Sequence, residues 1–281
     1  MFLKKLISKI GIVFKFLRRA IQLRIQLLPL DKKLPFKGKL APSGYFQFYL
    51  KKNTILALSK LKQSNLDKEN RICLRISEKQ ALEEIFSLIT PEIRSYLGAD
   101  SYLDGMHWNV TDAIKSHDKL EQSNSISWHT DNVGNRLKLF LCIKGDGSQP
   151  TLIVPDQNRV PTLTKWAYSI FMESFRRFGI KNKINIYNSI AIKHFPGTAN
   201  IFDTQLLHRG KYEKSKVTRI VLVLEFSNPE KHIITKGPIG TKKHNAFVFD
   251  EKLLSIKSFK SILDPTRIHA NGQSLLYSKT I

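Results

Sequence analysis

The chain has 281 residues, of which 42% are hydrophobic and 25% charged, and this is the composition of a folded protein with a sizeable core. Its 17 Phe, 8 Tyr and 3 Trp residues exclude a disordered chain. Lys and Arg outnumber Asp and Glu by 46 to 23, for a formal net charge of +23. Such an excess favours a polyanionic partner (nucleic acid, anionic lipid or a phosphorylated substrate), with Lys-rich surface loops as an equally simple explanation.

The two cysteines, Cys73 and Cys142, each lie inside an apolar run. We expect both to be buried free thiols in a reducing compartment, which predicts a cytoplasmic protein. Two cysteines are too few for a disulfide framework or a cysteine-based metal site.

Residues 1–28 have the pattern of a basic amphipathic helix. Most hydrophobic residues, from Phe2 through Phe14 to Leu28, fall on one broad arc, and most Lys and Arg residues fall on the other. Such a helix can lie peripherally in an anionic membrane interface, can pack on the domain, or can be a targeting presequence. No uncharged run approaches the roughly 20 apolar residues of a membrane span, and Lys9 interrupts any signal-peptide core.

Residues 31–43 read as a linker, so we expect residues 1–43 to be helix and linker and residues 44–281 to be one domain. The first part of this domain is predicted to be mixed. The expected elements are helices at 54–62 and 78–88, a strand at 71–76, and a separate short helix that Thr90-Pro91-Glu92 opens.

Strand patterns dominate the rest of the domain. Strands are expected at 101–110, 125–131, 136–144, 151–154, 183–195, 199–202 and 218–226, with turns at 209–217 and helices at 161–178 and 250–263. Many short strands with helices before and among them predict a mainly β fold with flanking helices (α+β). The core we expect is a double-stranded β-helix, a relative of the jelly roll.

One short motif, Trp128-His129-Thr130-Asp131, carries the chemistry. His129 and Asp131 are two residues apart, so on an extended strand both side chains leave the same face. His208 is the best candidate for a third ligand. Two imidazoles and one carboxylate form the facial triad that holds Fe(II) in non-haem oxygenases and leaves positions open for co-substrate and O₂.

Arg219 lies eleven residues after His208, in a predicted strand that could pair back beside it. A guanidinium there can bind a dicarboxylic acid bidentately while the other end of the acid chelates iron. The spacing of all four residues is more specific than the isolated His-x-Asp pair.

Over residues 95–226 the chain resembles the phytanoyl-CoA dioxygenase family. The resemblance implies that His129, Asp131 and His208 bind Fe(II) and that Arg219 binds the C5 carboxylate of 2-oxoglutarate. The implied activity is an Fe(II)- and 2-oxoglutarate-dependent dioxygenase that uses O₂ to hydroxylate a C–H bond. Related halogenases have a small residue in place of the acid, so Asp131 favours hydroxylation.

The resemblance leaves the substrate open, because the family's Pro-Gly-Ser-His run is replaced by Pro155-Asp156-Gln157-Asn158. The basic charge indicates a small anionic metabolite, lipid or sugar precursor. The alternative is a non-catalytic membrane-surface or nucleic-acid binding protein on a degenerate oxygenase fold. A nucleic-acid demethylase is less favoured, since Glu225 stands where that related type usually has a second arginine.

Other polar and aromatic residues are weaker candidates. His107 and Asn109 flank Trp108 on a predicted strand and could line the pocket. Trp128 and Trp166 are expected in the core. The remaining histidines have no partner at an informative spacing and are expected on the surface: His117, His194, His232, His244 and His269.

Overall fold

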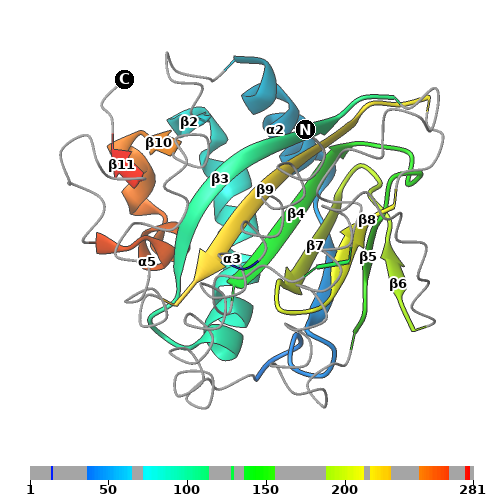
Figure 1. Ribbon diagram of the computed structural model, residues 1–281. Coiled ribbons are helices and arrows are strands. Elements are labelled where there is room, and N and C mark those ends of the chain that lie inside the picture. The colour runs from blue at the N-terminus through cyan, green and yellow to red at the C-terminus, as the bar shows by residue number, and fades with distance from the viewer. Residues whose placement is uncertain are drawn as a thin grey trace.

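The computed structural model describes residues 14, 37–64, 72–113, 128–129, 136–155, 188–211, 216–228, 247–265 and, for the backbone, 276–278. Two facing β-sheets form its centre, and helices cover the outer face of the larger one (Figure 1). Within these ranges no helix is long and apolar enough to cross a bilayer.

The larger sheet has five antiparallel strands in the order β1-β7-β4-β9-β3. Its strands are β1 (Tyr45–Tyr49), β3 (Tyr102–Thr111), β4 (Arg136–Lys144), β7 (Thr198–Asp203) and β9 (Arg219–Ser227). In β4, Leu137, Leu139 and Leu141 are fully buried in the main core with the helices. Because side chains alternate along a strand, Lys138 and Phe140 project from the opposite, inner face.

The smaller sheet has the order β6-β5-β8, with β5 at Thr151–Ile153, β6 at Ile190–Ile192 and β8 at His208–Gly210. Ile153 and Ile192 from this sheet share a buried cluster with Phe202 and Phe140 from the larger sheet. The two sheets therefore pack face to face, as in a double-stranded β-helix. The predicted mainly β fold with flanking helices is confirmed.

Helices α2 (Lys52–Ser64) and α3 (Lys79–Leu97) cover the outer face of the larger sheet (Figure 1). The prediction of two helices meeting near Pro91 was wrong, because α3 runs through Pro91 without a break. Its buried stripe continues on both sides of the proline, from Ile85 and Ile89 to Ile93. Burial of that stripe outweighs the backbone hydrogen bond that proline cannot donate.

A third, parallel sheet was not predicted. It has the order β11-β10-β2, with β2 at Ile72–Leu74, β10 at Phe247–Phe249 and β11 at Leu276–Ser278. The short run of β10 shows no periodicity of its own, and its pairing with β2 joins residues far apart in sequence. The helix expected at 250–263 is two pieces, η7 (Glu251–Ser255) and α5 (Lys257–Ile262), because Ile256 is extended between them.

The end of the expected linker is already part of the fold. Leu40 is fully buried in the main core, and the backbone N–H of Lys37 donates to the carbonyl of Ser95. The expected helix at 161–178 lies outside the described residues, as does the amphipathic segment 1–28 apart from Phe14.

The uninterrupted α3 makes a testable prediction. Pro91→Ala should raise the free energy of unfolding by about 1–3 kcal/mol, because it restores an N–H donor and removes the ring clash inside the helix. Guanidinium unfolding followed by circular dichroism measures the change. Leu88→Ala, at a half-exposed position of the same helix, is the control and should change little. A destabilised Pro91→Ala variant would contradict this account of α3.

Candidate active site

His129 and His208 are brought together by strand pairing. The N–H of His129 donates to the carbonyl of His208 at 3.0 Å, and the N–H of His208 donates to the carbonyl of His129 at 2.9 Å. Residues that exchange both hydrogen bonds in an antiparallel pair send their side chains to the same face. The two imidazole rings accordingly lie 4.3 Å apart between centroids.

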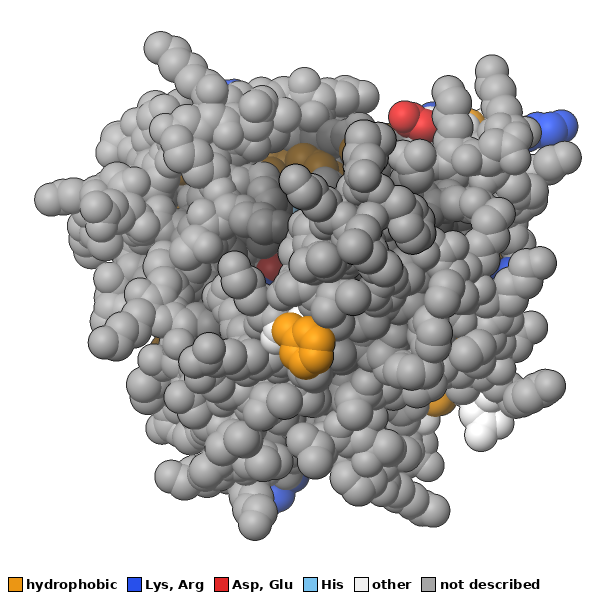
Figure 2. All heavy atoms as spheres, in the orientation of Figure 1, with side chains coloured by type: hydrophobic (Ala, Val, Ile, Leu, Met, Phe, Trp, Pro, Cys, Tyr) orange, Lys and Arg blue, Asp and Glu red, His pale blue; other side chains and the backbone are white. Residues whose placement is uncertain are grey.

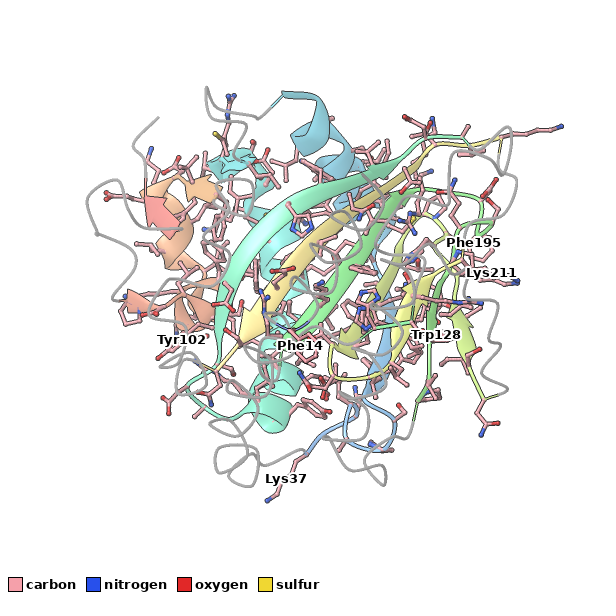
Figure 3. All side chains as sticks on the ribbon, viewed as in Figure 1. Phe14, Lys37, Tyr102, Trp128, Phe195 and Lys211 are labelled. Atoms are coloured by element: carbon pink, nitrogen blue, oxygen red, sulfur yellow. The ribbon has the colours of Figure 1, made fainter. Side chains whose placement is uncertain are left out.

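The ring of His208 points between the two sheets. It lies 5.4 Å from the ring of Phe202 on β7, in an edge-on contact, and His208 is 6% exposed. Its register partner on β5, Ile153, is fully buried in the cluster between the sheets. On the outer face of the small sheet, Arg209 instead stacks over the fully buried Trp128, which confirms the expected core position of this tryptophan (Figure 3).

The turn before His208 fixes which of its ring nitrogens can bind a metal. The side chain of Asp203 accepts a hydrogen bond from the N–H of Gln205, and Tyr96 of α3 donates its hydroxyl to the same carboxylate at 2.7 Å. After this turn, Nδ1 of His208 lies 2.9 Å from the carbonyl oxygen of Leu206. A carbonyl only accepts, so Nδ1 carries the proton and Nε2 of the neutral ring keeps the lone pair that a metal needs.

Asp131 lies outside the described residues. Among the described residues no group of three His, Cys, Asp or Glu side chains is close enough to hold a metal. The structure thus brings two of the three expected ligands together. The roles of His129, Asp131 and His208 as Fe(II) ligands stay predictions. The pairing of His129 with His208 and the tautomer of His208 are compatible with them.

Arg219 begins β9 and is held by acceptors from two directions. The β3–β9 register places Thr111 directly opposite Arg219, and Asn109 two residues away on the same face. One terminal nitrogen donates to Asn109 Oδ1 at 3.2 Å and to Thr111 Oγ1 at 3.1 Å, and the other donates to the carbonyl of Gln149 at 2.7 Å. At 8% exposure this is a buried, oriented guanidinium suited to a carboxylate.

His194 corrects a prediction, because it is 1% exposed and not a surface residue. It lies two residues past Ile192, so the alternation of β6 turns it toward the space between the sheets. Its Nε2 lies 3.1 Å from the Thr151 hydroxyl, and its ring packs 5.6 Å from that of Phe140. Burial, with a further contribution from the charge of Arg219, lowers the pKa of His194 to about 3.

Both cysteines are buried free thiols, as expected. Cys142 lies on the inner face of β4, where burial raises its pKa to about 12 although the charge of Arg219 acts in the opposite direction. It is therefore a neutral side chain and not a thiolate nucleophile.

The other end of the inner face carries a buried ionic cluster. Arg136 is paired with Glu225, and its Nε lies 3.9 Å from Asp104. The Nζ of Lys138 lies 3.7 Å from Glu225, and the Lys138 side chain is 21% exposed against 7% for Glu225. On β9, Arg219 and Glu225 are six residues apart, or roughly 20 Å at the usual strand rise. The inner face therefore has one cationic end at Arg219 and a second charged end at Lys138.

Sequence reasoning found part of this site. Asn109 was singled out as a pocket residue, and the structure gives it a definite contact with Arg219. Thr111, Gln149 and His194 were missed. The alternation of His107, Asn109 and Thr111 along one strand face was the pattern that could have revealed Thr111.

The chain is similar to a number of solved structures, three of which follow. AviO1 from Streptomyces viridochromogenes Tue57 is 13% identical, with 68% of this chain and 92% of that chain covered and a TM-score of 0.45. EvdO2 from Micromonospora carbonacea var. aurantiaca, complexed with 2-oxoglutarate, is 13% identical. The match covers 67% of this chain and 87% of that chain, with a TM-score of 0.43. EctD from S. alaskensis with bound Fe is 15% identical. The match covers 71% of this chain and 79% of that chain, with a TM-score of 0.42.

No protein-family model matches the sequence, and no curated protein matches it. At these identities and TM-scores the likeness concerns the fold alone.

The burial of His194 predicts a pH dependence of stability. Its pKa is about 3 in the fold against an ordinary 6.5, so the unfolded chain binds a proton first as the pH falls. The stabilisation is complete above pH 6.5 and is lost toward pH 3, by at most roughly 1.4 kcal/mol per pH unit. Urea unfolding at about pH 7 and about pH 5 measures the change. The free energy of unfolding should fall more between these two pH values for the wild type than for His194→Gln. Equal losses would contradict the buried neutral state.

Proposed function

We propose that this chain is an Fe(II)- and 2-oxoglutarate-dependent dioxygenase that hydroxylates a C–H bond of a small anionic metabolite, lipid or sugar precursor. The observation that carries the proposal is the pairing of His129 with His208, with Nε2 of His208 left to bind a metal. In the proposed site, Asp131 supplies the carboxylate ligand. Fe(II) and 2-oxoglutarate, when bound, supply the oxidising chemistry, with O₂ as the oxidant and succinate and CO₂ as co-products.

Each described residue of the site has a role in this reaction. His129 and His208 hold the metal, and the hydrogen bond from His208 Nδ1 to Leu206 fixes the orientation of that ring. Arg219 binds the far carboxylate of 2-oxoglutarate. Asn109 and Thr111 hold its guanidinium in place, so that little side-chain entropy is lost on binding. Phe140 and Phe202 form the apolar wall that excludes water.

The charged end of the inner face supports an anionic substrate. Lys138 is the more exposed member of its ion pair with Glu225, and it lies directly across from Phe202, whose ring contacts His208. In this proposal the Lys138 ammonium attracts a carboxylate or phosphate of the substrate. The net charge of +23 raises the encounter rate with such anions.

The metal site is tested by spectroscopy under anaerobic conditions. Wild-type protein should bind one Fe(II) per chain and, with 2-oxoglutarate, develop a visible metal-to-ligand charge-transfer band. His129→Ala, His208→Ala and Asp131→Ala should each lose that band, because each removes one proposed ligand.

His107→Gln is the matched control, since His107 lies on the inner face but is not a proposed ligand. It should keep the band. A wild-type protein with no band at saturating iron and 2-oxoglutarate would exclude the enzyme and favour a non-catalytic binding protein on this fold.

We also propose that residues 1–28 contact an anionic membrane surface. Phe14 is helical and 66% exposed, and it lies on the arc that the sequence makes hydrophobic. Figure 2 shows a hydrophobic side chain standing on the front face at the position that Figure 3 labels Phe14. An exposed aromatic residue in a sequence segment rich in lysine and arginine suits an anionic headgroup layer.

Deletion of residues 1–36 should weaken sedimentation with phosphatidylserine vesicles, because it removes the amphipathic segment and leaves the buried Leu40 in the fold. Phosphatidylcholine vesicles are the control and should bind weakly in both cases. Unchanged sedimentation with phosphatidylserine would show that the segment is not the anchor.

A further inference from the structure

The buried imidazole of His194 has no role in the reaction described above. Its partner Thr151 is two residues from Gln149, whose carbonyl accepts a hydrogen bond from Arg219. His194 is 1% exposed and faces the space between the sheets, where the charge of Arg219 reaches it. Its Nε2 contacts Thr151, but its buried Nδ1 has no hydrogen-bond partner among the described residues. A buried nitrogen left unpaired is costly, so such an atom in a native protein points to a ligand.

The contact with Thr151 is compatible with a proton on Nδ1 of His194, because a hydroxyl can donate to Nε2. Burial and the neighbouring Arg219 keep the ring neutral, so it has one N–H and one lone pair. If the Thr151 hydroxyl donates to Nε2, the proton is on Nδ1. Nδ1 is then a buried, neutral N–H donor.

We propose that His194 is a second recognition residue for 2-oxoglutarate, with Nδ1–H donating to the C5 carboxylate that Arg219 binds. This inference rests on the proposed function. Arg219 alone would supply charge, whereas His194 adds a directed donor without adding a second cation. In this proposal Thr151 is a positioning residue, because a hydroxyl that donates to Nε2 leaves the proton of the neutral ring on Nδ1.

Two amide substitutions of His194 distinguish the contribution of Nδ1 from that of Nε2. The amide nitrogen of Asn occupies roughly the place of Nδ1, and that of Gln roughly the place of Nε2. His194→Asn should therefore keep most of the affinity for 2-oxoglutarate. His194→Gln should raise its dissociation constant about tenfold, the usual effect of one hydrogen bond to a charged group. Thr151→Val leaves His194 in place and should raise the dissociation constant of 2-oxoglutarate by a smaller factor.

The measurement is an anaerobic titration of the Fe(II)-loaded full-length protein, read by the charge-transfer band. Two ligands are compared, 2-oxoglutarate and 2-oxovalerate, which chelates iron in the same way but lacks the C5 carboxylate. His194→Gln and Thr151→Val should weaken the binding of 2-oxoglutarate and leave that of 2-oxovalerate unchanged.

The outcomes separate this inference from the proposal on which it rests. An equal effect of His194→Gln on both ligands, or no effect on 2-oxoglutarate, would overturn the role of His194 and leave the enzyme intact. A wild-type protein that gives no band with either ligand would overturn both. Near-ultraviolet circular dichroism shows which variants are folded, and Thr151→Val supplies the same test if His194→Gln does not fold.

Discussion

Two backbone hydrogen bonds join His129 to His208 across the edge of the small sheet, and the rest of the candidate site is arranged around that pair. Strand pairing puts the two side chains on the same face, one opposite the other. The turn that begins at Asp203 then orients the ring of His208, because the carbonyl of Leu206 in this turn accepts a hydrogen bond from Nδ1. The hydroxyl of Tyr96 ties this turn to α3, so the helical layer on the far side of the large sheet also supports the site.

The same inner face must hold charge in a buried space, and it does so by pairing each charge with local acceptors or counter-charges. Arg219 is surrounded by neutral acceptors, which orient it without cancelling its charge. Arg136, by contrast, is neutralised by Glu225 and Asp104. A cation oriented but not neutralised is suited to an incoming dianion, whereas a neutralised one stabilises the sheet.

The fold could be predicted where local pattern and tertiary environment agree. The alternation of Leu137, Leu139 and Leu141 predicted β4 to the residue, because one face of that strand packs on helices and the other on the second sheet. The prediction failed at Pro91, where local chemistry favours a break but a continuous buried stripe favours one helix. It also failed for β10, whose partner β2 is distant in sequence.

The sequence by itself determined the mainly β class, the His-x-Asp motif with His208 and Arg219 at fixed distances, and the basic amphipathic start of the chain. Those are properties of spacing and composition. Only the tertiary structure decided that His194 is buried, that Thr111 and Gln149 hold Arg219, and that Lys138 pairs with Glu225. These facts follow from the register between strands far apart in the chain, which spacing along one strand does not contain.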